Sequence, residues 1–365
     1  MFNWVKINEG HDNFFTPLRL LFAVLVLIGH AYVVALGDPM AEVNVFYAYK
    51  PSYLAVNLFF IASGFLVTKS MLYRGDIPEY SSARLLRIYP ALIIHVFFVM
   101  FIVGPFVTNL PLKEFFTNPQ FYTQPLQVLS FYETQMILPG ALEKNAEQFG
   151  SAPLWTLRYE ILAYIGTAIA FSLGLLKHRW MIFAQFAICS IAWCLAKSTG
   201  LYDSLPGTGQ NILRFGICYG LGAAVYAYRD YLRFHVLGIF VLGIAAALTN
   251  GTVLFEITTA LCLGYFVFWA AYVKAPKLDG LKTLSDTSYG IYIYHWCIMQ
   301  WIFYYVPSLS PLQLMALTLP VTIIIATLSW HYVEKPMLKN KTSFASFLRF
   351  GQKKRKLNIA EYAAE

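Results

Sequence analysis

The sequence has 365 residues, of which 58% are hydrophobic, 17% aromatic and only 13% charged. Soluble domains carry about 25% charged residues, so this chain has too few polar side chains to cover a water-soluble fold. The net charge of +8 is scattered between apolar runs, with one cluster at 353–356, which favours membrane topology over nucleic-acid binding. The composition excludes a soluble domain, and we expect membrane lipids and no nucleic acid as partners.

Ten apolar segments are long enough to cross a hydrocarbon core of about 30 Å. The segment at 234–249 is the weakest, because it is short and is followed at once by Asn250 and Gly251. We predict an all-α, polytopic integral membrane protein with about ten transmembrane helices. The predicted segments are residues 17–36, 51–71, 88–108, 157–176, 180–196, 211–228, 234–249, 253–273, 289–306 and 312–331.

An even number of crossings places both termini on one side of the membrane. Of the 27 Lys and Arg residues, 21 fall on the side of the termini and 6 on the other. Because positive residues near span ends are retained in the cytoplasm, we predict that both termini are cytoplasmic. No clean cleavage site follows the first segment, so we expect that segment to be retained.

The segments divide the chain into a membrane domain over residues 1–336 and a basic cytoplasmic tail over 337–365. The tail mixes Lys and Arg with aromatic residues, which is typical of an interfacial helix on an anionic leaflet. The loop over 109–150 faces the opposite side in this topology. Its length is typical either of a folded lid or of a loosely ordered connector.

Charged and titratable side chains inside spans are functional candidates, because burying them costs free energy. Arg19 and His30 are eleven residues apart, or three helical turns, so they share one helix face about 16 Å apart along the axis. Arg19 would bind an anionic group at the cytoplasmic rim, and a neutral His30 ring would accept a proton at mid-depth. In the alternative, Arg19 extends to the interface and His30 only hydrogen-bonds a neighbouring helix.

Two further places carry charge at span ends. Arg84 and Arg87 are three residues apart, so on a helical turn they point the same way and can bind phosphates together. Taken alone, such a pair is more typical of cytoplasmic positive charge than of a phosphate site. Glu160, near the start of the fourth segment, would orient or deprotonate an acceptor hydroxyl. Its alternative role is as a partner of Arg158 or of the helix dipole.

The ninth segment begins with an aromatic stripe in which Ser288, Tyr292 and His295 fall on one helical face. Aromatic stripes are more typical of packing than of a site, but His295 within it is a functional candidate. The remaining titratable residues inside apolar runs, namely His95, Arg214, Glu256 and His331, are expected to be interhelical hydrogen-bond partners. The five cysteines lie in apolar runs without CxxC spacing, so we expect neither a disulfide nor a metal site.

Five segments in this order resemble the membrane-bound acyltransferase family three, the integral-membrane O-acyltransferases that modify cell-surface sugars. A closing Glu334-Lys335-Pro336 is also similar, and the chain differs from many members at Thr16 and Leu20. The segments are Arg19 with His30; Phe59-Phe60 with Ser63-Gly64-Phe65; Arg84-x-x-Arg87 with Tyr89-Pro90; Leu154-Trp155-Thr156-Leu157 with Glu160; and Ser288-Tyr289 with Tyr292 and His295.

The resemblance implies transfer of an acyl group, most often acetyl, from cytoplasmic acyl-coenzyme A to a hydroxyl of a cell-surface or lipid-linked glycan. It implies residence in the bacterial cytoplasmic membrane, acetyl-coenzyme A as donor, a glycan acceptor and no metal. The roles it implies are catalytic for His30, Glu160 and His295; donor-binding for Arg19, Arg84 and Arg87; and substrate-binding for Trp155, Ser288, Tyr289 and Tyr292.

Two other functions fit a chain with ten spans and charges within the membrane. One is a transporter or flippase of a lipid-linked sugar, although the sequence shows neither an inverted repeat nor paired broken helices. The other is a catalytically inactive sensor or scaffold on the same fold. Coenzyme A binding and covalent change of the acceptor distinguish the acyltransferase from both.

Overall fold

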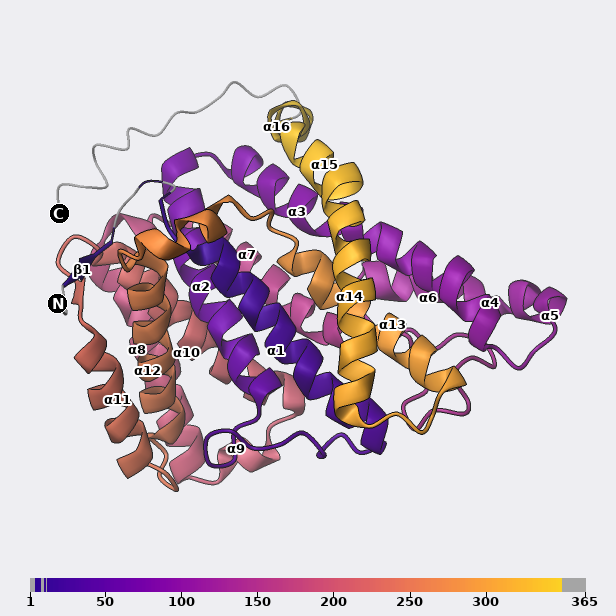
Figure 1. The fold of residues 1–365 in the computed structure, drawn as a ribbon. Coiled ribbons are helices and arrows are strands. Elements are labelled where there is room, and N and C mark those ends of the chain that lie inside the picture. The colour runs from indigo at the N-terminus through magenta and orange to yellow at the C-terminus, as the bar shows by residue number, and fades with distance from the viewer. Residues whose placement is uncertain (1–3, 8–9, 11, 350–365) are drawn as a thin grey trace.

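The computed structural model describes residues 4–7, 10 and 12–349, and these residues are mostly helical, with almost no strand (Figure 1). The described strands are β1 (Val5–Lys6) and β2 (Arg233–Phe234), which pair antiparallel with Val5 opposite Phe234. The predicted all-α class is therefore confirmed for the described residues.

A helix lies at each of the ten predicted apolar segments. The third and last predicted segments continue as α-helix through π-helical segments, at Val99–Val103 and Trp330–Glu334 respectively. The α-helices are α1 (Phe15–Leu36), α2 (Pro51–Arg74), α3 (Ile77–Phe98), α4 (Gly104–Val107), α5 (Leu112–Thr117), α6 (Pro119–Leu129), α7 (Leu157–Ser172), α8 (Arg179–Ser198), α9 (Leu201–Ser204), α10 (Gly207–Ala227), α11 (Val236–Leu248), α12 (Phe255–Tyr272), α13 (Ser288–Tyr305), α14 (Pro311–Ser329), α15 (Lys335–Lys339) and α16 (Lys341–Leu348), with 3₁₀ turns at Pro153–Thr156, Leu175–Lys177 and Pro276–Thr283.

Six helical stretches of the described chain are long and apolar enough to cross a membrane. The apolar side chains on α11 and α14 face outward, with Phe240 63% and Ile324 60% exposed. Such surfaces suit lipid and not water. The chain is a membrane protein, while the number of crossings and the cytoplasmic placement of the termini stay predictions.

The residues at the junction of α2 and α3 show why the chain turns there. Pro51 occupies the first turn of α2, where its missing N–H costs nothing. The helix ends at Gly75, which adopts a φ of 58° that glycine reaches without strain. Asp76 then caps α3 by accepting a hydrogen bond from the Glu79 backbone N–H at 3.0 Å. This tight turn places the N-terminal part of α3 beside the end of α2.

Glycines let α2 and α10 approach so closely that their backbones touch. A Cβ on Gly64 would lie 2.0 Å from the Tyr219 carbonyl oxygen, and a Cβ on Gly222 would lie 2.0 Å from the Ile61 carbonyl oxygen. Membrane helices use small residues in this way, because lipid gives them no hydrophobic drive to associate. This contact fixes α2, which carries one wall of the site described below.

Ion pairs and hydrogen bonds join neighbouring segments at both ends of the helices. Asp12 pairs with Lys282 at 2.5 Å, and both belong to segments assigned to the side of the termini. At the opposite end Tyr305 donates to the Phe106 carbonyl at 2.5 Å, and Trp193 donates to the Val253 carbonyl at 3.0 Å.

The loop over 109–150 is folded. It contains α5 and α6, and Asn145 donates to the side chain of Gln300 on α13 at 2.6 Å. Gln300 in turn donates to the Glu147 carbonyl at 2.9 Å. Of the two alternatives left open by the sequence, the folded lid fits these contacts, whereas a loosely ordered connector does not.

The predicted tail begins with two short helices that the structure describes and ends outside the described residues. Helices α15 and α16 run from the end of α14 across the N-terminal part of α3 (Figure 1). The cluster at 353–356 lies outside the described residues.

Candidate active site

A cavity of about 450 Å³ lies between α1, α2, α3, α7, α13 and the segment that follows α14. Three side chains of the second motif, Phe59, Phe60 and Ser63, form part of its wall, whereas the adjacent Gly64 faces α10. The residues predicted from sequence that line this cavity are Arg19, Arg84, Arg87, Glu160, Ser288, Tyr289 and Tyr292. Five segments far apart in the sequence thus meet at one pocket.

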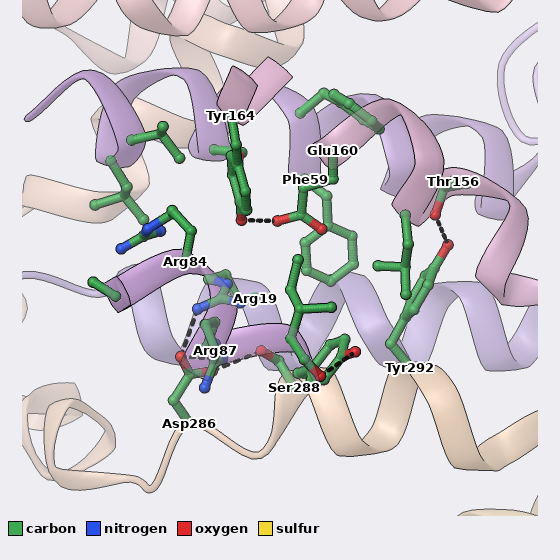
Figure 2. A pocket seen from close by; sticks show the side chains of 18 of the residues that line it. Arg19, Phe59, Arg84, Arg87, Thr156, Glu160, Tyr164, Asp286, Ser288 and Tyr292 are labelled. Atoms are coloured by element: carbon green, nitrogen blue, oxygen red, sulfur yellow. Dashed lines mark hydrogen bonds and ion pairs between the residues drawn. The ribbon is translucent and has the colours of Figure 1, made fainter. Parts of the chain in front are cut away.

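Figure 2 shows that the pocket has two chemically different ends. Arg19, Arg84 and Arg87 gather at one end, which we call the cationic end. Thr156 and Tyr292 meet at the other, where their hydroxyl oxygens lie 2.6 Å apart. We call this the tyrosine end; Phe59 and Glu160 lie between the two.

An ion-pair network built on Asp286 organises the cationic end. Asp286 Oδ2 lies 2.5 Å from Arg19 Nη1 and 2.8 Å from Arg87 Nη2. Arg87 Nη1 lies 3.3 Å from Glu334 Oε2, and the Glu334 side chain is fully buried. The π-helical segment Trp330–Glu334 carries that carboxylate, so the irregular turn contributes directly to the site.

The Asp286 carboxylate is held in its charged form. Burial alone would raise its pKa, but the guanidinium groups of Arg19 and Arg87 and a hydrogen bond from Ser288 outweigh burial, and they lower the pKa to about 2. Ser288 Oγ donates to Asp286 Oδ1 at 2.6 Å. Arg19 and Arg87 are therefore neutralised in part by the protein itself.

Arg84 is a pocket arginine that has no carboxylate partner among the residues described. Its guanidinium lies 5.5 Å from the centre of the Tyr164 ring, and its Nε is buried without a hydrogen-bond partner. A buried, unpartnered donor on a permanent cation is costly in the absence of an anion. Arg84 is thus available to a ligand in a way that Arg87 is not.

Glu160 faces the pocket and does not pair with Arg158. Tyr164, one turn further along α7, donates its hydroxyl proton to Glu160 Oε1. Arg158 points elsewhere and donates to the Tyr132 carbonyl at 3.2 Å. The alternative role of Glu160 as a partner of Arg158 is therefore wrong, and the carboxylate remains available within the pocket.

His30 and His295 form a directly bonded pair. His30 Nδ1 lies 2.8 Å from His295 Nε2, and the rings stack with centroids 5.1 Å apart. His295 Nδ1 lies 3.0 Å from the Ile291 carbonyl oxygen, which only accepts hydrogen bonds. In the neutral pair His295 therefore carries its proton on Nδ1 and accepts at Nε2, so His30 donates from Nδ1. This tautomer leaves the lone pair of His30 on Nε2.

The histidine pair lies just beyond the tyrosine end of the pocket. The rings of Tyr292 and His295, one turn apart on α13, have centroids 6.4 Å apart. Neither histidine lines the pocket in this conformation. His30 does hydrogen-bond a neighbouring helix, as its alternative role requires, but its partner is a second titratable ring. Its Nε2 has no hydrogen-bond partner among the described residues. Tyr292 lines the pocket, and its ring also lies beside that of His295.

Other residues singled out in the sequence lie away from the pocket. Trp155 packs against Phe215, with ring centroids 5.9 Å apart, and its role in substrate binding stays a prediction. His331 is exposed and bonds its own helix through the Thr327 carbonyl at 2.9 Å, so its assignment to an interhelical bond was wrong.

The other three expected hydrogen-bond partners do join separate elements. Arg214 on α10 donates to Asn57 on α2 at 2.8 Å. Asn57 donates to Glu256 on α12 at 3.2 Å. His95 lies 3.3 Å from Ser151 Oγ in the segment that precedes α7. These buried contacts hold helices together and do not reach the pocket.

Comparison with known proteins decides the family. A family model described as an acyltransferase domain matches residues 13–331. The chain belongs to the acyltransferase 3 family. Among curated proteins, this acyltransferase is 25% identical to Nodulation protein 10 of Rhizobium leguminosarum bv. viciae, over 93% of this chain and 96% of that one. It is 26% identical to an O-acetyl transferase of Shigella phage Sf6, over 90% and 96% of the two chains. No solved structure matches significantly.

Sequence reasoning missed several residues that build this acyltransferase pocket. Asp286 was not among the predicted site residues, and Glu334 was noted only as part of a closing motif. A signal was available, because Arg19 lies within a predicted span, where a charged side chain is usually paired. Tyr164 and Lys341 carried no such signal, since a tyrosine in a span and a lysine in a basic tail are ordinary in those places.

Proposed function

We propose that this chain transfers an acetyl group from acetyl-coenzyme A to a hydroxyl of a cell-surface or lipid-linked glycan. Membership of the acyltransferase 3 family gives the reaction class, and the O-acetyl transferase relative supports acetyl as the group and oxygen as the acceptor atom. The coenzyme A donor, the glycan acceptor and the bacterial cytoplasmic membrane are proposed from the motif resemblance.

The observation that carries the proposal is the order of groups along one pocket. The cationic end fits the phosphates of a nucleotide, because guanidinium groups bind phosphate oxygens in pairs. The largely apolar stretch past Phe59 fits the pantetheine arm. Beyond Tyr292 comes the bonded pair of His30 and His295. A donor anchored by its phosphates thus points its thioester toward a base.

The proposed step is general-base catalysis of acyl transfer. His30 Nε2 takes the proton of the acceptor hydroxyl, and the oxygen forms a bond to the thioester carbonyl carbon. The carbon–sulfur bond then breaks, and coenzyme A leaves as the thiol after receiving a proton from the His30 imidazolium. A positioned base contributes about 10²- to 10⁴-fold. Glu160, in the same pocket, is placed to orient a hydroxyl group.

A histidine exchange tests the proposal. His30→Ala is expected to leave the protein inserted and folded, and to abolish transfer of labelled acetyl from acetyl-coenzyme A to surface glycan, measured by mass spectrometry of the glycan. His331→Ala is the matched control, because His331 is exposed and bonds only its own helix. Transfer near the wild-type level in His30→Ala would refute the role of this base.

Arginine exchanges test the donor site. Arg84→Ala is expected to raise the KM for acetyl-coenzyme A about tenfold or more, the effect of losing a charge-assisted contact, with kcat little changed. Arg233→Ala is the control, because Arg233 is the exposed residue of strand β2. A transporter of lipid-linked sugars would instead move its substrate without covalent change, and would show no binding of coenzyme A to the purified protein.

A further inference from the structure

The C-terminal helices contribute to the wall of the pocket. Leu338 at the end of α15 and Lys341 at the start of α16 both line the cavity. The sequence places them in a cytoplasmic tail beyond the membrane domain, with no expected part in the site. The structure instead brings them to the pocket whose other cations come from α1, α2 and α3.

Helix α16 is fastened to α3 at both of its ends. At its start, Ser82 Oγ donates to the Lys341 carbonyl at 2.6 Å. At its end, Arg349 Nη2 donates to Asp76 at 2.7 Å and to Glu79 at 3.2 Å. The Arg349 side chain is only 13% exposed, and Ala345 between the two attachments is fully buried. The backbone of Lys341 is thereby held at the pocket.

The charges that line the pocket do not balance. Five cationic side chains and two carboxylates line the pocket. One of the carboxylates, Asp286, is already ion-paired with Arg19 and Arg87. Within the described part of the chain, Arg74, Arg84 and Lys341 have no ion-pair partner. Three unpaired cations from three different helices repel one another unless an anion lies between them.

We propose that Lys341 is a donor-binding residue, which together with Arg74 and Arg84 forms a site for a phosphate group of the donor. A phosphate monoester carries about 1.5 to 2 negative charges at neutral pH, so it matches a cluster of uncompensated cations better than a carboxylate does. This inference rests on the proposed function, because it takes the donor to be a coenzyme A thioester. It extends the donor site to a helix outside the predicted membrane domain.

Direct binding of coenzyme A to the purified full-length protein in detergent tests this role without need of an acceptor. Lys341 is exposed to water at the pocket, so Lys341→Ala is expected to fold normally. Its Kd for coenzyme A should rise about fivefold, as for loss of one partly solvated ion pair to a divalent group, and the rise should shrink in high salt. Lys341→Arg should retain the wild-type affinity.

Lys339→Ala is the matched control, because Lys339 is exposed two residues away and does not line the pocket. Adenosine 3′,5′-bisphosphate should compete with coenzyme A, and its affinity should fall in Lys341→Ala but not in Lys339→Ala. If the wild type binds coenzyme A and Lys341→Ala binds it equally well, this inference is wrong and the proposed function stands. If the wild type does not bind coenzyme A, the proposed function itself is wrong.

Discussion

His30 Nδ1 lies 2.8 Å from His295 Nε2, although 265 residues separate them in the sequence. Because the Ile291 carbonyl fixes the proton of His295 on Nδ1, the second histidine fixes the tautomer of the first. In the proposed mechanism His295 therefore positions His30, and His30 acts as the base.

This relationship predicts different effects for two exchanges at position 295. His295→Ala removes the acceptor for His30 Nδ1–H and should lower kcat about 10²-fold, the lower end of the contribution of a base, with little change in the KM for acetyl-coenzyme A. His295→Gln retains an acceptor oxygen and should recover part of the rate. Steady-state kinetics with both variants measure this split; equal activity of the Ala variant and the wild type would contradict the tautomer argument.

Asp286→Asn should destabilise the protein, because it leaves Arg19 and Arg87 without their shared charge. Removing one partner of a buried pair costs about 3 to 5 kcal/mol. Because the Asp286 side chain is still 20% exposed, water screens part of the charge, and we expect a loss of stability at the lower end, about 3 kcal/mol. Thermal unfolding in detergent measures this. Asp12→Asn is the control, because Asp12 pairs with Lys282 but is 71% exposed, and such pairs contribute about 0 to 1 kcal/mol.

The effect of Asp286→Asn on stability should depend on pH. The pKa of Asp286 is lowered from 3.8 to about 2, so its stabilising charge is fully present above pH 4 and is lost as the pH falls toward 2. The difference in unfolding temperature between the wild type and Asp286→Asn should therefore stay constant from about pH 5 to 9 and shrink below about pH 4. A difference that disappears between pH 5 and 7 would show that this carboxyl is not held charged.

Tyr292→Ala should uncouple cleavage of acetyl-coenzyme A from transfer of the acetyl group to the acceptor. Tyr292 lines the pocket and its ring lies beside that of His295, so we expect removal of the ring to open the pocket toward the histidines and to admit water to the thioester. Hydrolysis of acetyl-coenzyme A without acceptor should rise severalfold and should disappear in the double variant with His30→Ala. Tyr292→Phe should show a smaller rise, because the ring remains. Unchanged hydrolysis in Tyr292→Ala would show that Tyr292 is no barrier.

Gly222→Ala should weaken the contact between α2 and α10. Its methyl group would lie 2.0 Å from the Ile61 carbonyl oxygen, so the helices must separate, at a cost of about 1 to 3 kcal/mol. Gly166→Ala on α7 is the control, because nothing lies within 4 Å of a Cβ there; it should be neutral or stabilising by up to about 1 kcal/mol. Equal unfolding temperatures for the two variants would contradict the close-packing argument.

Local patterns predicted much of this molecule. The length of each apolar run correctly predicted a helix at all ten expected segments. This works because hydropathy can be calculated from consecutive residues alone. Helical spacing also placed Arg84 and Arg87 on one side of α3, and Ser288 and Tyr292 on one face of α13, where all four meet the pocket.

Local sequence patterns could not predict which distant segments contact each other. Nothing in the spacing shows that Arg87 shares Asp286, 199 residues away, with Arg19, or that the tail returns to α3 through Ser82. Such contacts depend on how the helices pack, and many packings satisfy the same apolar pattern. For the same reason Trp155, which belongs to a motif, faces Phe215 instead of the pocket.

The central claim is that a donor anchored at Arg84 presents its thioester to His30. The most direct measurement is a structure of the protein with a non-hydrolysable acetyl-coenzyme A analogue bound. We predict phosphates against Arg84 and Lys341, the pantetheine arm past Phe59, a displaced Tyr292 ring and the carbonyl carbon close to His30 Nε2. An analogue bound outside this pocket, or one whose carbonyl remains on the arginine side of an unmoved Tyr292, would contradict the account.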